Sequence, residues 1–355
     1  MSKIVSGIQQ IGIGVSDLET SWAWYRKYFA MDVCIFEEKA LANFMLHYTE
    51  GKPRERHAVL AINMQGGGGF EVWQHTGKTP QPPKEPLMIG DTGINICKMK
   101  TFDAQKALDY FKVEGLNVLS PLLKTPNKVN HFFMSDPWGN IFQFIEDSYL
   151  FTKDKRVNGG TYGAIIGVSD IEKSLAVYQE ILNYDTIVYD LTDTFGDLTN
   201  LNGGQSKFRR VLLAHSEKRQ GAFAPLLGPT QIELVQVLDR APAHVYAGRM
   251  WGDPGFMHLC FDINGFESLR EECQQKGFAF TVDSTKALDK TFDMGDAAGN
   301  FSYISDPDGT PIEFVETRKV PIMKKLGLYI KLYNRDPKKS LPMWILKALR
   351  FQRKK

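Results

Sequence analysis

A histidine in a strand-like stretch is the side chain of this sequence best suited to bind a metal ion. His258 lies in the apolar segment FMHLCFDI at 256–263, and a neutral imidazole is the commonest metal ligand among side chains. A single histidine in an apolar strand is, however, more often a buried, hydrogen-bonded core residue. A metal site at His258 therefore requires further ligands from elsewhere in the chain.

Other motifs of enzyme chemistry do not occur. The sequence has no C-x-x-C, G-x-S-x-G or H-E-x-x-H motif, and the cysteines Cys34, Cys97, Cys260 and Cys273 lack the spacing of metal ligands, which predicts buried free thiols. The glycine run at 66–69 is not followed by G-K-[ST] and precedes a strand. We therefore predict a flexible hairpin turn there instead of a phosphate-binding loop.

The elements that would position His258 belong to a duplicated pattern. Three matches in the same order indicate a tandem duplication with a displacement of 153 residues between the first pair. The matching pairs are GVSDLETSWAWY at 14–25 with GVSDIEKSLAVY at 167–178, MIGDTGI at 88–94 with MWGDPGF at 250–256, and SDPWGNIFQF at 135–144 with SDPDGTPIEF at 305–314.

Each half divides again into two units of one helix and four strands. The first unit has a helix from about Asp17 to Phe29 with Asp17 as N-cap, and the second has one from about Phe102 to Glu114. The chain thus contains four βαβββ modules. Because a single module leaves an open sheet face and unpaired edges, we expect an α+β fold in which pairs of modules form curved, half-barrel-like sheets around clefts.

The duplication and the charge distribution divide the chain into three parts. We predict an N-terminal domain at 1–152, a C-terminal domain at 153–318 and a basic tail at 319–355. Between Arg318 and Lys355 lie thirteen Lys and Arg and one acid, which leaves 30 basic and 40 acidic residues, a net charge of −10, in the body. We expect the tail to form two short amphipathic helices and to pack on the acidic body; membrane-surface binding through Trp344 and its neighbours is the alternative.

The overall composition is that of a soluble globular protein. It is 43% hydrophobic and 24% charged, no run approaches the roughly eighteen apolar residues of a membrane span, and the N-terminus lacks the apolar stretch of a secretory signal. These features predict a cytoplasmic protein, and the acidic body gives no indication of a nucleic-acid partner.

D-P-x-G at 136–139 and at 306–309 predicts a hairpin before the last strand of each half.

The repeated phrases resemble those of the vicinal oxygen chelate superfamily, which includes glyoxalase I, bleomycin-resistance proteins and extradiol dioxygenases. The similarity covers nearly everything from Ile8 to Glu316 and rests on the V-S-D-hydrophobic-E-x-S helix starts and the D-P-x-G-x-x-[EQ] turns. It is specific for the fold but not for the reaction, because one fold supports many chemistries.

The resemblance implies that metal ligands come from the first and the last strand of each module. Their positions in this chain are Gln10 and Glu71 in the first module, Asn95 and Gln143 in the second, Gly163 and Glu233 in the third, and His258 and Glu313 in the fourth. The alternatives are a strand glutamate that faces solvent at positions 71 and 313, and Gln9 in place of Gln10.

Two ways of pairing the modules remain open. If the first module faces the fourth, as the resemblance to glyoxalase I implies, Gln10, Glu71, His258 and Glu313 share one cleft, and Asn95, Gln143, Gly163 and Glu233 share a weaker one. If modules pair within each half, the C-terminal half keeps Glu233, His258 and Glu313. We favour the crossed pairing, a monomer with an internal pseudo-dimer, because it produces one complete site.

A site with these donors suits a divalent Zn, Ni, Co, Mn or Fe ion. The implied function is that of a glyoxalase-like lyase or isomerase for a small substrate with adjacent oxygens, in which an enediolate or enolate is stabilised and Glu313, with Glu71 as its counterpart, serves as general base. A metal-free binding or resistance protein and an Fe(II) ring-cleaving dioxygenase are alternatives, although Gly163 in place of a ligand argues against the dioxygenase.

The substrate is less well defined. Glutathione-binding glyoxalases carry an arginine and an asparagine where this chain has Gly14 and His75, so glutathione contacts are not predicted. We expect His75 to be an exposed loop residue. The sequence offers an apolar pocket lining instead, from the side chains Phe70, Trp73, Phe132, Phe133, Met257 and Tyr303.

Overall fold

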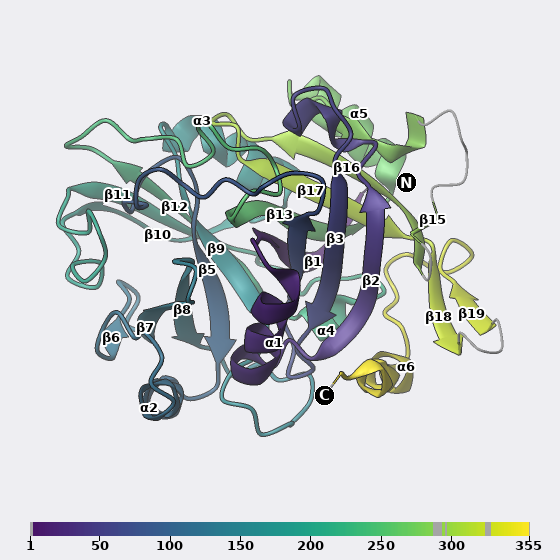
Figure 1. Ribbon diagram of the computed structural model, residues 1–355, viewed down its shortest axis with the longest axis horizontal. Coiled ribbons are helices and arrows are strands. Elements are labelled where there is room, and N and C mark those ends of the chain that lie inside the picture. Colours follow the sequence, from purple (N-terminus) through teal and green to yellow (C-terminus); the bar gives the residue numbers. More distant parts are fainter. Residues whose placement is uncertain (1–2, 287–292, 295–296, 324–327, 355) are drawn as a thin grey trace.

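The computed structural model describes residues 3–286, 293–294, 297–323 and 328–354. Its strands form two large curved sheets and one small hairpin (Figure 1). Sheet A has the order β14-β16-β17-β13-β1-β4-β3-β2, with β15 paired to β16. Its strands are β1 (Ile4–Gly14), β2 (Val33–Leu41), β3 (Glu55–Ile62), β4 (Gly69–His75), β13 (Gly255–Asn264), β14 (Val282–Asp283), β15 (Asp293–Met294), β16 (Ala297–Ser305) and β17 (Pro311–Thr317).

Sheet B contains the two middle modules in the order β10-β11-β12-β9-β5-β8-β7-β6. The first module therefore pairs with the fourth and the second with the third, as the crossed arrangement requires. The strands of sheet B are β5 (Gly93–Thr101), β6 (Leu123–Lys124), β7 (Asn130–Ser135), β8 (Ile141–Glu146), β9 (Thr161–Gly167), β10 (Thr186–Asp193), β11 (Phe208–Ala214) and β12 (Gln231–Val237).

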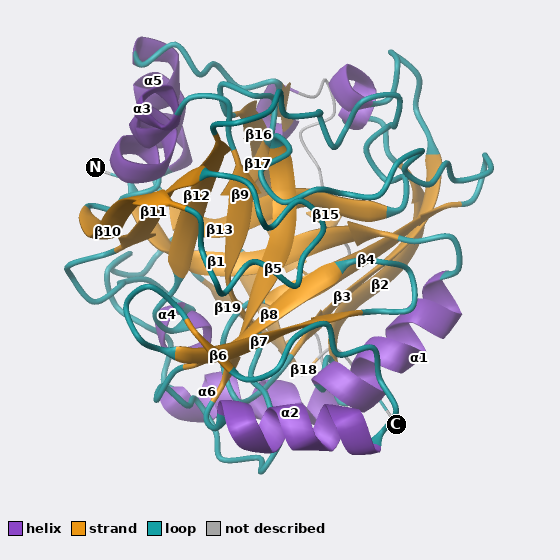
Figure 2. Cartoon of the chain, turned by 90° about the vertical axis from the view of Figure 1, so that its left-hand side faces the viewer, coloured by secondary structure: helices purple, strands orange, loops and turns teal. Residues whose placement is uncertain are grey.

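The module helices begin where the sequence predicts them. The Asp17 carboxylate accepts from the Thr20 amide at 3.0 Å and caps α1, and Asp103 and Asp170 cap their helices in the same way. Helices α1 and α2 lie together on one side of the sheets, and α3 and α5 lie together on the other (Figure 2). The helices are α1 (Leu18–Phe29), α2 (Ala104–Val113), α3 (Ile171–Leu175), which continues as the π-helical turn η2 (Ala176–Ile181), and α5 (Phe266–Gln275); the shorter ones are η1 (Met45–Tyr48), α4 (Ala224–Leu227) and η3 (Ser284–Lys286).

One large apolar core joins the two sheets. It contains residues of both sheets and of the four module helices, and Phe70 of β4 contacts Phe142 of β8 with ring centroids 5.8 Å apart. All four cysteines are buried thiols that form no disulfide bond within the described residues, as predicted. None of the helices in the described ranges is long and apolar enough to span a membrane.

Two of the repeated motifs, the first helix of each half with its tyrosine and the D-P-x-G turn, contact each other in this core. The Tyr25 hydroxyl donates to Asp136 at 2.6 Å, and the Tyr178 hydroxyl donates to Asp306 at 2.8 Å. Each aspartate also accepts backbone amides of its own D-P-x-G turn, in which the glycine has a positive φ. The repeated tyrosine thus fixes the turn of the following module, so each half links sheet A to sheet B.

The glycine run at 66–69 belongs to the connection between the antiparallel strands β3 and β4, as the predicted hairpin turn requires, and it is tightly packed. It is buried, and Gly68 exchanges backbone hydrogen bonds with Thr161 at 2.9 and 2.8 Å. A Cβ on Gly67 would lie 2.8 Å from the Gly160 carbonyl carbon, and one on Gly160 would lie 2.2 Å from the Gly68 oxygen. The two glycine segments therefore permit close backbone contact between the halves.

The tail is partly helical. Helix α6 (Met343–Ala348) and the 3-10 turn η5 (Leu349–Gln352) are present, but the segment expected to form the first tail helix is a hairpin of β18 (Lys319–Met323) and β19 (Leu328–Lys331); Leu326, one of its expected apolar residues, lies outside the described residues. Arg353 pairs with Asp32 at 3.0 Å and with Asp154 at 2.6 Å, which holds the end of the tail on the body.

Candidate metal centre

Four side chains from four neighbouring strands of sheet A meet at one point. In the register of the sheet, Gly12 of β1 lies opposite both Glu71 of β4 and His258 of β13, and Cys260 lies opposite both Gln10 and Glu313 of β17. Side chains two residues apart on a strand share one face of the sheet. The pairing of β1 with β13 therefore brings the donors of the first module to those of the fourth.

The contacts in this cluster are short. The His258 Nε2 atom lies 3.3 Å from Glu71 Oε2 and 3.1 Å from Glu313 Oε2. The Gln10 amide nitrogen donates to Glu71 at 3.2 Å and to Glu313 at 3.3 Å. All four residues are buried, His258 completely, which excludes the solvent-facing orientation considered for the two glutamates.

The cluster depends on a glycine next to the histidine. A Cβ on Gly12 would lie 2.3 Å from the His258 Cε1 atom and 2.9 Å from its Nε2 atom. Real Cβ contacts are essentially never that short, so a larger residue at position 12 would displace the imidazole. Gly12 thus leaves the space into which His258 projects.

Charge and packing both act on the imidazole. Burial lowers the pKa of His258, but the carboxylates of Glu313 and Glu71 outweigh it and raise the pKa to about 9. The ring stacks on Trp251 at 5.8 Å with an interplanar angle of 15° and meets Tyr303 edge-on at 5.6 Å. The ring orientation is therefore fixed by packing on both sides.

The donor set fits a divalent metal ion. Ligand atoms of Glu71, His258 and Glu313 all lie within 4.8 Å of one another. The Gln10 Oε1 atom is buried and has no hydrogen-bond partner among the described residues. Because an amide keeps its shape when turned by 180°, that turn places the oxygen beside both carboxylates and completes a four-donor set with two negative charges, which suits Zn, Mn, Fe, Co or Ni.

A cavity of about 290 Å³ opens onto this cluster. Gln10, Glu71 and Glu313 line it, whereas the buried His258 lies behind them. Of the apolar residues predicted to line a pocket, Trp73 and Tyr303 do so. The others, Phe70, Phe132, Phe133 and Met257, belong to the cores.

Residues that the sequence did not indicate also line the cavity. Trp251 comes from the loop before β13, and Leu349 and Gln352 come from the tail. No local pattern marks them, because a loop and a distant tail reach the site only through tertiary packing. His75 was expected in solvent, but it is buried edge-on against Trp73 at 4.5 Å, and burial lowers its pKa to about 4.

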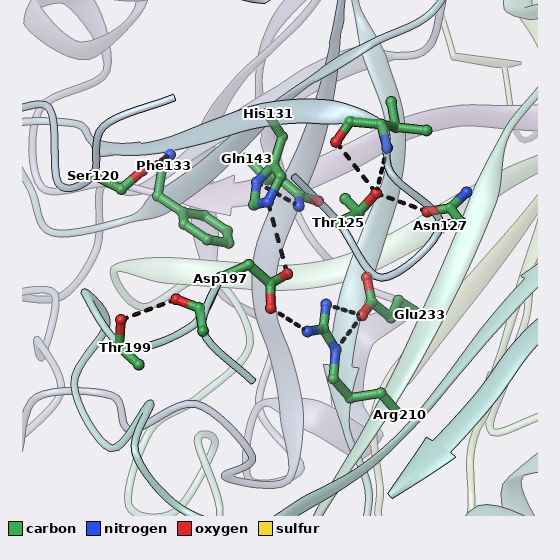
Figure 3. A network of polar contacts seen from close by, with 12 residues as sticks. Ser120, Thr125, Asn127, His131, Phe133, Gln143, Asp197, Thr199, Arg210 and Glu233 are labelled. Carbon is green, nitrogen blue, oxygen red and sulfur yellow. Dashed lines mark hydrogen bonds and ion pairs between the residues drawn. The ribbon is translucent and has the colours of Figure 1, made fainter. Parts of the chain in front are cut away.

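The pseudo-equivalent cleft in sheet B is filled by ion pairs (Figure 3). The Arg210 guanidinium contacts Glu233 at 2.6 Å and Asp197 at 2.7 Å, and Lys98 contacts Glu233 at 3.0 Å. All four side chains are buried. Burial alone would raise the pKa of Glu233, but Arg210 and Lys98 lower it to about 2, so this carboxylate is occupied by protein cations.

The other residues expected in that cleft lie as follows. Gln143 contacts His131 at 3.0 Å, and Gly163 lies against the Gln231 backbone, with no space for a Cβ. Asn95 is not at the ligand position: it bonds to backbone groups of the preceding turn, from Gly90 to Gly93, and the register puts Ile96 where Gln10 lies in sheet A. The same register shift occurs in β1 between Ile8 and Gln10, so Asn95 corresponds to Gln9 and the predicted ligand position was one residue too early.

Comparisons with known proteins agree with this architecture. Two family models, both described as Glyoxalase/Bleomycin resistance protein/Dioxygenase superfamily, match residues 7–144 and 164–294. Glyoxalase I from Zea mays is similar in structure, with 13% identity, a TM-score of 0.55 and coverage of 89% of this chain and 92% of that one; a mutant of that enzyme gives 14% identity, a TM-score of 0.54 and coverage of 89% and 94%. A comparison with curated protein sequences found no match. The two matched domains and the shared fold place this chain in the glyoxalase, bleomycin resistance protein and dioxygenase superfamily.

Proposed function

We propose that this protein is a metal-dependent, glyoxalase-like lyase or isomerase for a small substrate with two adjacent oxygens. The observation that carries the proposal is the meeting of Gln10, Glu71, His258 and Glu313 in one cluster, three of whose side chains line the same cavity. A divalent ion held by these donors would act as a Lewis acid toward the substrate oxygens. The two carboxylates would balance its charge.

The glutamates supply the proton chemistry. Glu313 lies at the cavity surface and contacts His258 on its buried side, so its carboxylate can reach a carbon next to the bound oxygens. In the proposed reaction Glu313 removes a proton from that carbon and returns it to the neighbouring carbon. Glu71 faces it from β4 and remains as counter-charge.

Metal content after a histidine substitution tests the centre. Purified protein loaded with Zn²⁺ and dialysed should retain about one ion per chain by elemental analysis, and His258→Ala should lose it. His131→Ala is the matched control, because His131 is also fully buried but lies in the filled cleft of sheet B. Metal retained by His258→Ala at the control level would overturn the proposed centre.

Hydrogen exchange tests the general base. Loaded protein in D₂O should exchange the protons of hydroxyacetone next to its carbonyl, as followed by NMR, and Glu313→Gln should slow the exchange by about 100-fold or more. Glu316→Gln, three residues further along the same strand, is the control. Metal-free protein that binds apolar ligands tightly but never retains an ion would support the alternative function of a small-molecule binding protein.

A further inference from the structure

The cavity extends well beyond the candidate metal centre, and its two ends differ in chemistry. The end at the centre carries Gln10, Glu71 and Glu313. The far end is lined mainly by aliphatic and aromatic side chains from β2, β3, the α4 region and the tail: Ile35, Ile62, Phe223, Leu226, Leu227 and Leu349.

Strand β3 connects the two ends. Leu60 lies opposite Glu71 in the β3–β4 pairing, and Ile62 lies two residues further along, roughly 7 Å away at the usual strand rise. Ile62 packs in the same apolar cluster as Leu226 of α4 and Leu346 of α6. The cavity lining therefore extends from the centre to the α4 and tail residues that pack with Ile62.

Charged side chains are scarce in the lining. Apart from the two glutamates of the centre, the described lining residues include Glu38 and Arg56 as charged groups, and these pair with each other at 2.6 Å. A charged peptide portion of a substrate would find no free cation or free acid along this wall. An apolar portion would displace water from aliphatic surface, which is favourable.

We infer that the substrate carries its adjacent oxygens at one end of an apolar body, and that this body occupies the far end of the cavity against Leu226 and Leu349. The inference rests on the proposed function for the oxygen-binding end and adds the substrate class. The tail is then part of the substrate site, because η5 supplies Leu349 to the wall.

Binding of hydroxamates of increasing chain length tests the inference. A hydroxamate presents two adjacent oxygens, so acetohydroxamate, hexanohydroxamate and octanohydroxamate differ only in their apolar part. Calorimetry on the Zn²⁺-loaded protein should show affinity rising by about 3- to 4-fold for each added methylene until the cavity is filled. An affinity that does not depend on chain length would overturn the inference and leave the proposed function intact.

Two tail variants locate the apolar portion. Leu349→Trp fills the far end and should remove most of the gain in affinity with chain length. Lys347→Trp places the same side chain on the exposed side of the tail helix and should bind all three probes as the wild type does. Ile62→Phe blocks the same end from β3 if Leu349→Trp does not fold. A chain-length gain that survives in both blocking variants would contradict the assignment.

Measurements on the metal-free protein distinguish a failure of the proposed function from a failure of the inference about the apolar end. If the protein never retains Zn²⁺, the proposed function fails, and 1-octanol binding to the metal-free protein then tests the apolar end alone. Binding that Leu349→Trp weakens at least 10-fold and Lys347→Trp does not would support the apolar site, and equal binding by the wild type and both variants would refute it.

Discussion

At the scale of single residues, one position distinguishes the two clefts. Gly12 on β1 and Lys98 on β5 occupy equivalent places, because each lies opposite the last-strand residue of its module, Glu71 or Gln143. Gly12 leaves room for the His258 ring, whereas Lys98 extends into its own cleft and pairs with Glu233. The same backbone thus holds either a candidate metal centre or a buried ion pair.

Gly12→Ala should weaken metal binding without unfolding the protein. The added Cβ would lie 2.3 Å from His258, so the imidazole must move, and small displacements of ligands typically cost about 10- to 100-fold in metal affinity. Competition with a chelator dye measures the change. Gly196→Ala is the control, since a Cβ there meets nothing within 4 Å; equal affinities in the two variants would contradict the role of Gly12.

Glu233→Gln should destabilise the protein strongly. It removes a buried charge that faces Arg210 and Lys98, and an uncompensated buried ion costs about 3–5 kcal/mol. Urea unfolding measures the loss. Glu172→Gln removes the exposed partner of Arg209 and should cost less than about 1 kcal/mol. Similar losses in the two variants would show that the sheet B cluster contributes no special stability.

Asp262 should make the protein less stable as the pH rises from about 4 to about 7. Burial raises its pKa to about 7, an effect that a hydrogen bond from Ser6 reduces and nearby Glu316 increases. Between about pH 4 and pH 7 the folded state keeps this proton whereas the unfolded state releases it, so stability falls across that range and the loss is complete above pH 7. Asp262→Asn should gain about 2 kcal/mol over the wild type between pH 5 and pH 8, measured by urea unfolding. The exposed control Asp109→Asn should gain no stability over the wild type in this pH range. If the stability that Asp262→Asn gains over the wild type were larger at pH 5 than at pH 8, the raised pKa of Asp262 would be contradicted.

At the scale of elements, local signals located the modules well. Helix starts and D-P-x-G turns are encoded in short stretches by an aspartate cap and by a glycine with positive φ, so the sequence predicts them within a few residues. The close contact of Gly67 with Gly160 depends on a distant segment of the chain, and no local pattern encodes it. The β18–β19 hairpin was missed for a related reason, since its apolar spacing also suits a helix.

The repeated tyrosine and aspartate pairs should be worth more than ordinary surface hydrogen bonds. Tyr178→Phe leaves the buried Asp306 without its hydroxyl donor, which we expect to cost about 1–3 kcal/mol, as Tyr25→Phe should at Asp136. Thermal and urea unfolding measure both. Tyr28→Phe removes a hydroxyl that accepts from exposed Lys27 and should change the stability very little. Equal losses of stability in all three variants would show that the buried tyrosine–aspartate hydrogen bonds contribute no more than an exposed one.

At the scale of the whole molecule, the crossed pairing makes the two halves depend on each other. Strand β1 pairs with β13 and strand β5 pairs with β9, so each sheet contains strands from both halves. Module boundaries follow from the sequence alone, but which modules pair does not, because both arrangements use the same strands. The resemblance to glyoxalase I indicated the crossed choice, and the strand order confirms it.

Residues 1–152 expressed alone should not form a folded monomer. The fragment would expose β1 and β5 as unpaired edges, which favours association or aggregation. Light scattering after size exclusion should show a mass above that of the monomer. Co-expression with residues 153–355 should restore a one-to-one complex with the unfolding behaviour of the intact chain, for which we propose a monomeric state. If the fragment were a monomer that unfolds cooperatively, the two halves would not depend on each other for folding.

Covalent fusion of the two halves has an evolutionary consequence. In a symmetric dimer of identical single halves, a mutation that put lysine in one cleft would put it in the other too, and both would lose their ligand positions at once. Joining the copies in one polypeptide removes that constraint, so one cleft can become a stabilising framework while its twin stays open. Lys98 of the first half lies opposite Gln143, whereas its counterpart in the second half, Cys260, lies opposite Glu313, and this contrast is the division of labour that such a release from symmetry permits.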